Sequence, residues 1–276
     1  MPNSDKVGKI IHVRPQNRLS QSLAIQARVV GALFLRETRT RFGNSILGYS
    51  WTLLEPAFQL AVWGAIFHLM GKLPPLSDSM MLFLITGLLP IMLFRDMVQQ
   101  LTASITANRT LLQFPIVHNI DVVTARALLE LANFFTLLTF SLATLGFFGV
   151  QFWPHDPTQL LLVVMAITLL GFGSGLINAV MACLFPTWAK FVPWYTRATY
   201  MTAGLFFLPG EMPPAARDFF FYLPMTQLVD WFRQAFFEGY QSQILSVPYI
   251  LACGLGTTFV GLAMERVFRR KISVQT

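Results

Sequence analysis

The chain has 276 residues, of which 54% are hydrophobic and only 12% are charged, and its mean hydropathy is +0.56. A soluble domain usually carries about a quarter charged residues. The uncharged blocks 158–186 and 239–264 exceed the roughly 20 residues that a helix needs to cross a bilayer. The composition therefore excludes an ordinary soluble enzyme and indicates a polytopic membrane protein.

The net charge of +7 is concentrated at the two ends of the chain. Residues 1–41 hold eight Lys or Arg against two acidic residues, and residues 265–276 hold four against one. Basic ends on a membrane protein mark the cytoplasmic side, which leaves little support for nucleic-acid binding. Cys183 and Cys253 lie in apolar blocks without a CxxC motif. The basic N-terminus does not resemble a cleaved signal peptide.

After a cytoplasmic tail at 1–19, residues 20–42 predict an amphipathic helix, and the interface segment is taken to run from 20 to 45. Leu23, Ala27, Val30 and Phe34 follow helical spacing, while the arginines stay on the polar side. Such a helix can lie at the level of the lipid headgroups. The alternative is a simple positive anchor before the first span.

Six membrane-spanning helices are predicted within a permease domain at 46–265, followed by a basic tail at 266–276. Their ranges are 51–70, 80–101, 126–150, 158–185, 191–208 and 245–264. Helices are expected because backbone polar groups in lipid must be satisfied within the segment. With the N-terminus inside, the inner side receives fourteen basic residues and the outer side only Lys72, Arg217 and Arg233. Both termini are therefore predicted to be cytoplasmic.

The second predicted span carries Arg95 and Asp96, which are costly inside a membrane. Neighbours in sequence point to different helix faces, so the two are not expected to pair with each other. Either they pair across helices and hold the bundle together, or they face a polar conduit, where the arginine would suit an anionic substrate. Glu55 and Glu130 are placed near the inner interface, with structural or coupling roles.

Two connecting segments are unusually apolar. Residues 108–123, on the inner side, present Leu111, Leu112 and Phe114, which either enter a groove of a partner protein or pack on the chain's own helices. Residues 209–243, on the outer side, hold four prolines and many aromatics, and predict two short helices that re-enter the outer leaflet at about 210–240. The alternative is an ordinary periplasmic loop.

Catalytic motifs are absent from the sequence, which contains no HExxH, GxSxG, Walker A or dinucleotide-binding fingerprint. The four histidines are scattered, so no metal site is predicted. Gly171, Gly173 and Gly175 in the fourth span predict close helix packing, within or between subunits. Aromatics crowd the stretch 185–240, half of them as ordinary interface anchors and the rest as faces on which sugars can stack.

Blocks along the chain resemble the permease subunits of type-2 ABC polysaccharide exporters, in particular the capsular polysaccharide branch (KpsM-like) of Gram-negative bacteria. They are RETRTRFG at 36–43, LGYSWTLLEP at 47–56, the segments 87–95 and 222–237, NRTLLQFP at 108–115, and ARALLE at 125–130. The resemblance runs from about residue 28 to the C-terminus, although the stretch 209–218 does not map residue by residue.

The resemblance implies an ABC-2 permease fold, all-α, in a homodimer of six-span subunits. Two copies of a cytoplasmic ATPase (KpsT-like) would bind ATP and Mg, so that this chain is neither an enzyme nor a holder of cofactors. A periplasmic co-polymerase (KpsE-like) and an outer-membrane channel would extend the path of a lipid-linked, Kdo-linked acidic polysaccharide through the bacterial inner membrane. The N-terminal helix and the segment at Phe114 and Pro115 would meet the ATPase.

The residues expected to carry these roles fall into three groups. The substrate path is assigned to Arg95, Asp96, Trp51, Tyr195, Tyr200, Phe206 and Phe207. The periplasmic gate is assigned to Phe219, Phe220, Tyr222, Trp231 and Phe232. Coupling to the ATPase is assigned to Arg36, Arg39, Arg41, Glu55, Arg109, Leu111, Leu112, Phe114 and Pro115. The alternative functions are export of O-antigen or a teichoic-acid-like polymer, a stand-alone secondary transporter, and a membrane glycosyltransferase.

Overall fold

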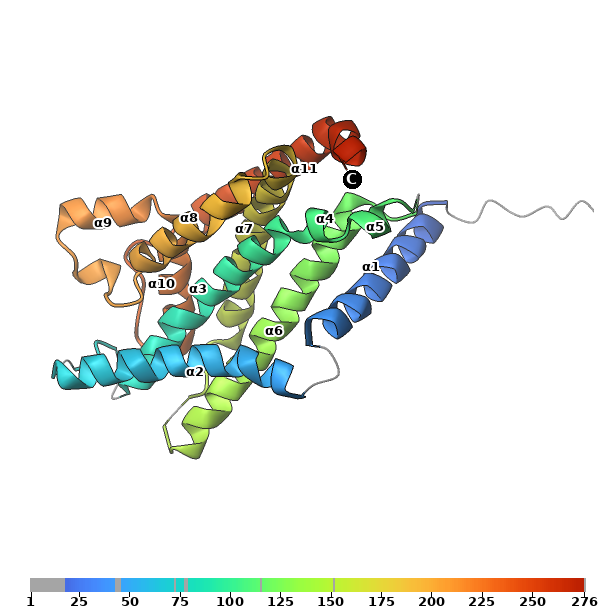
Figure 1. The fold of residues 1–276 in the computed structure, drawn as a ribbon. Coiled ribbons are helices and arrows are strands. Elements are labelled where there is room, and N and C mark those ends of the chain that lie inside the picture. The colour runs from blue at the N-terminus through green and yellow to red at the C-terminus, as the bar shows by residue number, and fades with distance from the viewer. Residues whose placement is uncertain are drawn as a thin grey trace, which may run out of the picture.

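The computed structural model describes residues 18–42, 46–71, 73–76, 79–114, 116–150 and 152–275. All regular structure in these residues is helical (Figure 1). The helices are α1 (Arg18–Phe42), α2 (Ile46–Leu69), α3 (Met80–Thr102), α4 (Ser104–Ala107), α5 (Arg109–Leu112), α6 (Asn119–Phe147), α7 (Pro157–Leu184), α8 (Trp188–Thr202), the 3-10 turn η1 (Pro209–Glu211), α9 (Pro214–Phe221), α10 (Pro224–Phe236) and α11 (Val247–Gln275).

Helix α3 forms the centre of the bundle. It packs against α7, α6 and α10, and α11 lies against the far side of α7 (Figure 1). Almost every side chain from Leu82 to Phe94 is buried. Helix α1 lies along α6, and α2 runs across the bundle with its main contact on α3. The bundle therefore has a dry apolar core on one side and two more peripheral helices, α1 and α2, on the other.

Within the described ranges, four helices are long and apolar enough to cross a membrane: α3, α6, α7 and the part of α11 at Val247–Lys271. Large apolar side chains remain exposed on their outer faces, among them Phe140 on α6, Met165 on α7 and Phe259 on α11. A contiguous apolar exterior is what a helix bundle in lipid requires. The part of α2 at Leu53–Leu69 is apolar as well but shorter.

The helices predicted for the spans 80–101 and 158–185 are present as α3 and α7. Helix α6 begins at Asn119, seven residues before the predicted start at 126. The reason is a capping box, in which the Asp121 carboxylate accepts a hydrogen bond from the His118 backbone N–H at 2.8 Å. At the other end of the chain, α11 continues past the predicted end at 264 to Gln275, so the basic residues 266–271 lie on its last turns.

The predicted span 191–208 is only partly helical, because α8 ends at Thr202. Gly204 follows with a φ of 84°, the left-handed conformation that commonly ends a helix and that suits glycine. Helix α8 is thus 15 residues long, about 22 Å at 1.5 Å per residue. This is shorter than the roughly 30 Å hydrocarbon core.

The close helix packing predicted for the glycines of α7 is present, since Gly171 and Gly175 face Met97 and Leu101 of α3 and Gly173 faces α11. A Cβ atom on Gly173 would lie 2.4 Å from the backbone nitrogen of Thr258 and 2.6 Å from its neighbour's Oγ1. Only glycine permits the two backbones to approach so closely. The small residues therefore serve packing within the subunit.

The segment 209–243 contains η1, α9 and α10, so the two short helices predicted for it are present, while their re-entry into the outer leaflet stays a prediction. Every residue of α10 from Met225 to Arg233 is buried against α3 and α7. Helix α9, in contrast, has no buried residue. The two helices thus differ completely in their surroundings.

Candidate functional site

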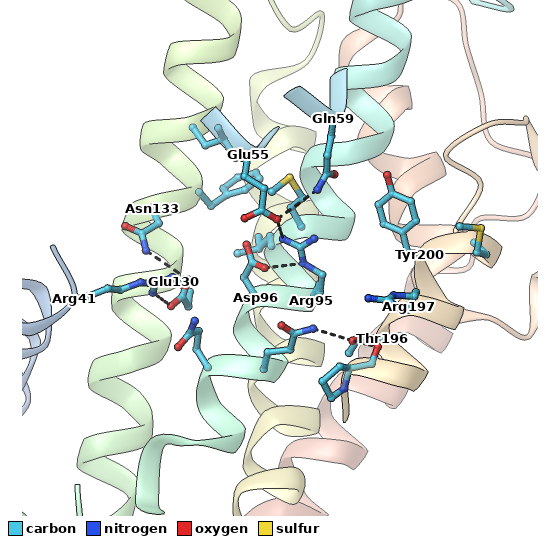
Figure 2. A pocket seen from close by; sticks show the side chains of 18 residues that line it. Arg41, Glu55, Gln59, Arg95, Asp96, Glu130, Asn133, Thr196, Arg197 and Tyr200 are labelled. Atoms are coloured by element: carbon cyan, nitrogen blue, oxygen red, sulfur yellow. Dashed lines mark hydrogen bonds and ion pairs between the residues drawn. The ribbon is translucent and has the colours of Figure 1, made fainter. Parts of the chain in front are cut away.

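A polar cavity of about 810 Å³ lies between α1, α2, α3, α6 and α8 (Figure 2). Its charged lining residues are Arg41, Glu55, Arg95, Asp96, Glu130 and Arg197. Neutral polar side chains, among them Gln59, Gln99 and Asn133, and apolar ones such as Met92 and Phe134 form the rest of the wall. A charged chamber inside an apolar bundle is a functional-site candidate, because ionisable groups in a membrane are otherwise avoided.

Arg95 forms the centre of an ion-pair network in this cavity. Its Nε donates to Asp96 Oδ1 at 2.8 Å, and its Nη2 donates to Glu55 Oε1, on α2, at 3.2 Å. The prediction that Arg95 and Asp96 do not pair is wrong. Adjacent residues diverge by about 100° around a helix, but the long arginine side chain bends back to the carboxylate, since both groups face the same chamber (Figure 2). Of the two alternatives predicted for Arg95 and Asp96, pairing across helices and lining a polar cavity, both therefore apply at this site.

Arg41, which was assigned to coupling, reaches the same cavity from the end of α1. It forms an ion pair with Glu130 on α6, whose other oxygen accepts from Asn133 Nδ2 at 3.5 Å. Glu130 is 4% exposed and lies three turns inside α6. Because α6 begins seven residues earlier than predicted, Glu130 lies deeper within the helix than the sequence indicated, on the wall of the cavity.

Helix α1 is attached to α6 and to the α4–α5 corner by further polar contacts. Arg36 Nη1 donates to Asn108 Oδ1 at 2.9 Å, and Asn108 Nδ2 donates to the Ser104 carbonyl at 3.0 Å. Glu37 pairs with Arg126, whose Nη1 also donates to the Gln100 carbonyl at 3.1 Å. These contacts fix α1 on the same end of the bundle as the cavity.

The inner segment divides between two environments. Leu111 and Leu112 pack on a small apolar cluster of α1 and α6 around Leu33, so part of the segment is covered by the chain's own helices. Phe114 and Ile116 are 59% and 61% exposed. Arg39 and Arg109 are exposed too. Pro115 lies outside the described residues.

The aromatic residues assigned to the substrate path do not share one wall. Tyr200 lines the cavity, whereas Tyr195 contacts α7, where Asn178 Nδ2 donates to its hydroxyl at 2.6 Å. The Phe206 ring lies 4.3 Å from that of Trp63, and the Phe207 ring lies 4.9 Å from that of Phe220, in both cases between centroids. The side chain of Trp51 lies outside the part that the structure describes.

The residues assigned to the gate are also separated. Phe219 and Tyr222 are exposed, Phe220 contacts Phe207, and Trp231 and Phe232 belong to the core. The Phe232 ring packs edge-on against Phe134, 6.4 Å between centroids. An aromatic surface at this end of the molecule is therefore formed by α9 and not by α10.

Arg233, which the charge count assigns to the outer side, is part of the buried face of α10. It is fully buried, and its guanidinium donates to the carbonyls of Leu205 and Phe207 at 3.0 Å each. It also lies 4.1 Å above the centroid of the Phe83 ring, a cation–π contact. The arginine supplies hydrogen bonds to carbonyls that follow the end of α8, and so it fixes the non-helical stretch 203–208.

Sequence reasoning assigned Tyr200 of α8 to the substrate path, but it missed Thr196, Arg197 and the glutamines of the cavity. Thr196, Arg197 and Tyr200 line it together, and Gln99 Nε2 of α3 donates to Thr196 Oγ1 at 3.1 Å. Thr196 and Arg197 precede Tyr200 by four and three residues, and this spacing alone indicates that the three side chains share one face of α8. Among the described residues, no group of three or more His, Cys, Asp or Glu side chains could hold a metal ion.

The comparisons with known proteins agree on one family. Residues 28–237 match the family model described as ABC-2 type transporter. The chain is 32% identical to the polysialic acid transport protein KpsM of Escherichia coli over 88% of this chain and 94% of that protein. It is 29% identical to the capsule polysaccharide export inner-membrane protein CtrC of Neisseria meningitidis over 92% and 96%. It is 20% identical to the O-antigen export system permease protein RfbA of Klebsiella pneumoniae over 83% and 87%. The chain therefore belongs to the ABC-2 type transporter family.

Proposed function

We propose that this chain is the permease subunit of an ATP-driven exporter that moves a lipid-linked capsular polysaccharide from the cytoplasm to the periplasm. The observation that carries the proposal is its similarity, over about nine-tenths of its length, to proteins named for polysialic acid transport and for capsule polysaccharide export. The cargo is proposed to be acidic and attached to its lipid through a Kdo linker. The charged cavity supports a polar cargo, because an apolar substrate would not need it.

The working unit is proposed to be a homodimer in the bacterial inner membrane, with six spans per subunit and both termini in the cytoplasm. Four helices meet the length and composition of a span. Helix α2 would supply the first span and α8, the shortest, the fifth. Helices α9 and α10 would form the re-entrant cap on the periplasmic side. The excess of basic residues in the segments assigned to the inner side supports this orientation.

Energy would come from two copies of a cytoplasmic ATPase (KpsT-like), which would hold ATP and Mg, while this chain holds no cofactor. The exposed side chains of Phe114 and Ile116 support a docking role, since apolar residues on a short connection need cover. Helix α1 and the α4–α5 corner are joined by Arg36 and Asn108, so both would respond to a movement of the ATPase.

The substrate path would pass the cavity around Arg95 and continue to the aromatic surface of α9. Beyond the membrane, a periplasmic co-polymerase (KpsE-like) and an outer-membrane channel would take over the polymer. An O-antigen permease is the second candidate, supported by the more distant similarity to RfbA. The stand-alone secondary transporter and the glycosyltransferase receive no support from the family match.

Complementation tests the proposal. The chain is expressed, with its own ATPase, in a Gram-negative strain that lacks its capsule permease, and polymer is measured at the cell surface and in the cytoplasm. We expect surface polymer to return, and to be lost again when the P-loop lysine of the ATPase is replaced. Export that persists with the inactive ATPase would contradict the proposal and favour a secondary transporter. Recovery of O-antigen alone, in a strain lacking that permease, would favour the second candidate.

A further inference from the structure

The cavity presents three arginines, and they differ in how their charge is balanced. Arg95 contacts two carboxylates, those of Asp96 and Glu55, and Arg41 pairs with Glu130. Arg197 has no carboxylate within ion-pair distance in the part of the chain that the structure describes. The three arginines face three carboxylates, so the formal charges of the cavity balance, but Arg197 is the cation without a direct carboxylate contact, and its donors are the ones open to a partner from outside the chain.

The position of Arg197 follows from the sequence of α8. Thr196 and Arg197 lie one turn after Pro193 and one turn before Tyr200 and Met201, and all five line the cavity. Residues three and four apart occupy one face of a helix, so α8 presents a single stripe to the chamber. Figure 2 shows Arg197 and Tyr200 on this wall, across the chamber from Glu55 and Asp96.

The surroundings of Arg197 suit an anion better than they suit a free cation. Gln99 donates to Thr196 Oγ1, which fixes the polar part of the stripe, and Tyr200 offers a hydroxyl one turn away. The neighbouring wall is apolar at Met92 and Met201. Arg197 is exposed, so its guanidinium is accessible to a ligand entering the cavity, and an arginine can hold a carboxylate or a phosphate through two parallel charge-assisted hydrogen bonds.

We propose that Arg197 binds the anionic group of the transported glycolipid, a sugar carboxylate or a lipid phosphate, in the α1–α2–α3–α6–α8 cavity. Arg95, the residue that the sequence favours, is then a structural cation held by Glu55 and Asp96. This inference rests on the proposed function for the identity of the cargo. Recognition of an anion at Arg197 is measurable without export.

The test measures binding to the complex of this chain with its ATPase in neutral phosphatidylcholine nanodiscs. The probes are a fluorescent sialic acid octamer, which carries carboxylates, lysophosphatidylglycerol, which carries a phosphate, and a neutral dextran octamer. The variants are Arg197→Gln, Arg197→Lys and Lys190→Gln. Lys190 is an exposed cation on the same helix outside the cavity, so its variant controls for general loss of positive charge.

We expect Arg197→Gln to weaken binding of at least one anionic probe about tenfold or more, in line with the loss of a charge-assisted bidentate contact. Arg197→Lys should recover part of the affinity, and Lys190→Gln should resemble the wild type. Weakening with the octamer alone identifies a sugar carboxylate as the ligand, and weakening with the lysolipid alone identifies the lipid phosphate. Dextran binding should not respond to any variant.

Three results would overturn the inference. The first is wild-type protein that binds neither anionic probe, and the second is an Arg197→Gln variant with unchanged affinity for both. The third is an Arg197→Gln complex that falls apart into monomers on native mass analysis, which would make Arg197 a contact between subunits. Failure of the wild-type chain to restore capsule, with anion binding intact, would reject the proposed function and leave the anion site standing.

Discussion

Two helix contacts in this molecule have opposite chemistry. Helices α7 and α11 meet through a backbone approach at Gly173, next to Thr257 and Thr258, without a charged group. Helices α1 and α6 meet through the ion pairs Glu37–Arg126 and Arg41–Glu130, beside a small apolar cluster. Close backbone packing tolerates almost no displacement, whereas ion pairs can exchange partners with little change in shape. The α7–α11 contact is thus a rigid joint, and the α1–α6 contact is an adjustable one.

The difference bears on where movement can enter the bundle. The adjustable contact joins the helix next to the exposed Phe114 region with Glu130 in the cavity. The rigid contact lies on the far side of α3, where neither helix contributes a residue to the cavity. A displacement of α1 would therefore reach the cavity without disturbing the α7–α11 pair.

Breaking the rigid joint should have the largest effect. Gly173→Leu places a side chain against the backbone of Thr258, where even a Cβ would lie 2.4 Å from the nitrogen. Backbone atoms cannot move aside as a flexible side chain can, so we expect no folded protein on size-exclusion chromatography. Gly256→Leu on α11 is the matched control, since a Cβ there meets nothing within 4 Å. Equal yields of the two variants would contradict the rigid-joint description.

Removing the buried carboxylate of the adjustable contact should have the second-largest effect. Glu130→Ala leaves Arg41 without its main acidic partner beside the apolar wall of the cavity. A hydrogen bond to a charged group typically contributes about 1.5–3 kcal/mol, and the Arg41 side chain, 30% exposed, can be solvated once its partner is removed, so we expect a measurable fall in Tm in detergent. Glu238→Ala, at an exposed site, is the control. A Tm loss no larger than that of the control would show that Glu130 is solvated.

Sequence alone predicted those parts of the fold in which local patterns decide the structure. The long apolar blocks gave α3 and α7 nearly to the residue, and the Pro-rich aromatic stretch gave α9 and α10. The end of α8 was missed, because apolar residues continue to Leu208 and only the left-handed backbone at Gly204 stops the helix. Hydropathy does not report such a backbone angle.

The candidate site was predictable only in part, because it is assembled from five helices. Arg95 was recognisable as a charge inside a span, but its partner Glu55 lies 40 residues away. Arg197 resembled an ordinary basic residue near a span end, and Arg233 an outer loop charge. Arg197 in fact lines the cavity and Arg233 lies in the buried core. Both positions depend on how α8 and α10 pack against α3. Sequence spacing alone does not define that packing.

A double-mutant cycle on Glu37 and Arg126 sharpens the description of the adjustable contact. The two side chains are 15% and 13% exposed, so their interaction is only weakly screened by water. We expect a coupling energy of about 1–2 kcal/mol, within the usual range for residues in direct contact, from the Tm values of the Ala variants. Glu37→Ala combined with Lys190→Ala should be additive. Additivity of the Glu37 and Arg126 variants would show that the pair does not hold α1.

The smallest expected effect concerns the N-terminus of α7, one of the two helices of the rigid joint, which Asp156 caps. The backbone N–H groups of Gln159 and Thr158 donate to its carboxylate and hold its pKa below the ordinary 3.8. Because the folded-state pKa is the lower one, this stabilisation is complete above about pH 4 and is lost as the pH falls through the folded value.

Measured between pH 3 and pH 6, the Tm of the wild type should fall more steeply at the acid end than that of Asp156→Asn. The asparagine keeps a side-chain oxygen for the cap and does not titrate in this range, so it isolates the charge. Asp156→Ala loses the cap at every pH and should lie below both at pH 6. If Asp156→Asn and the wild type keep parallel curves down to pH 3, the carboxylate charge contributes nothing to α7, and the α7–α11 joint depends on its glycine contact without help from the cap.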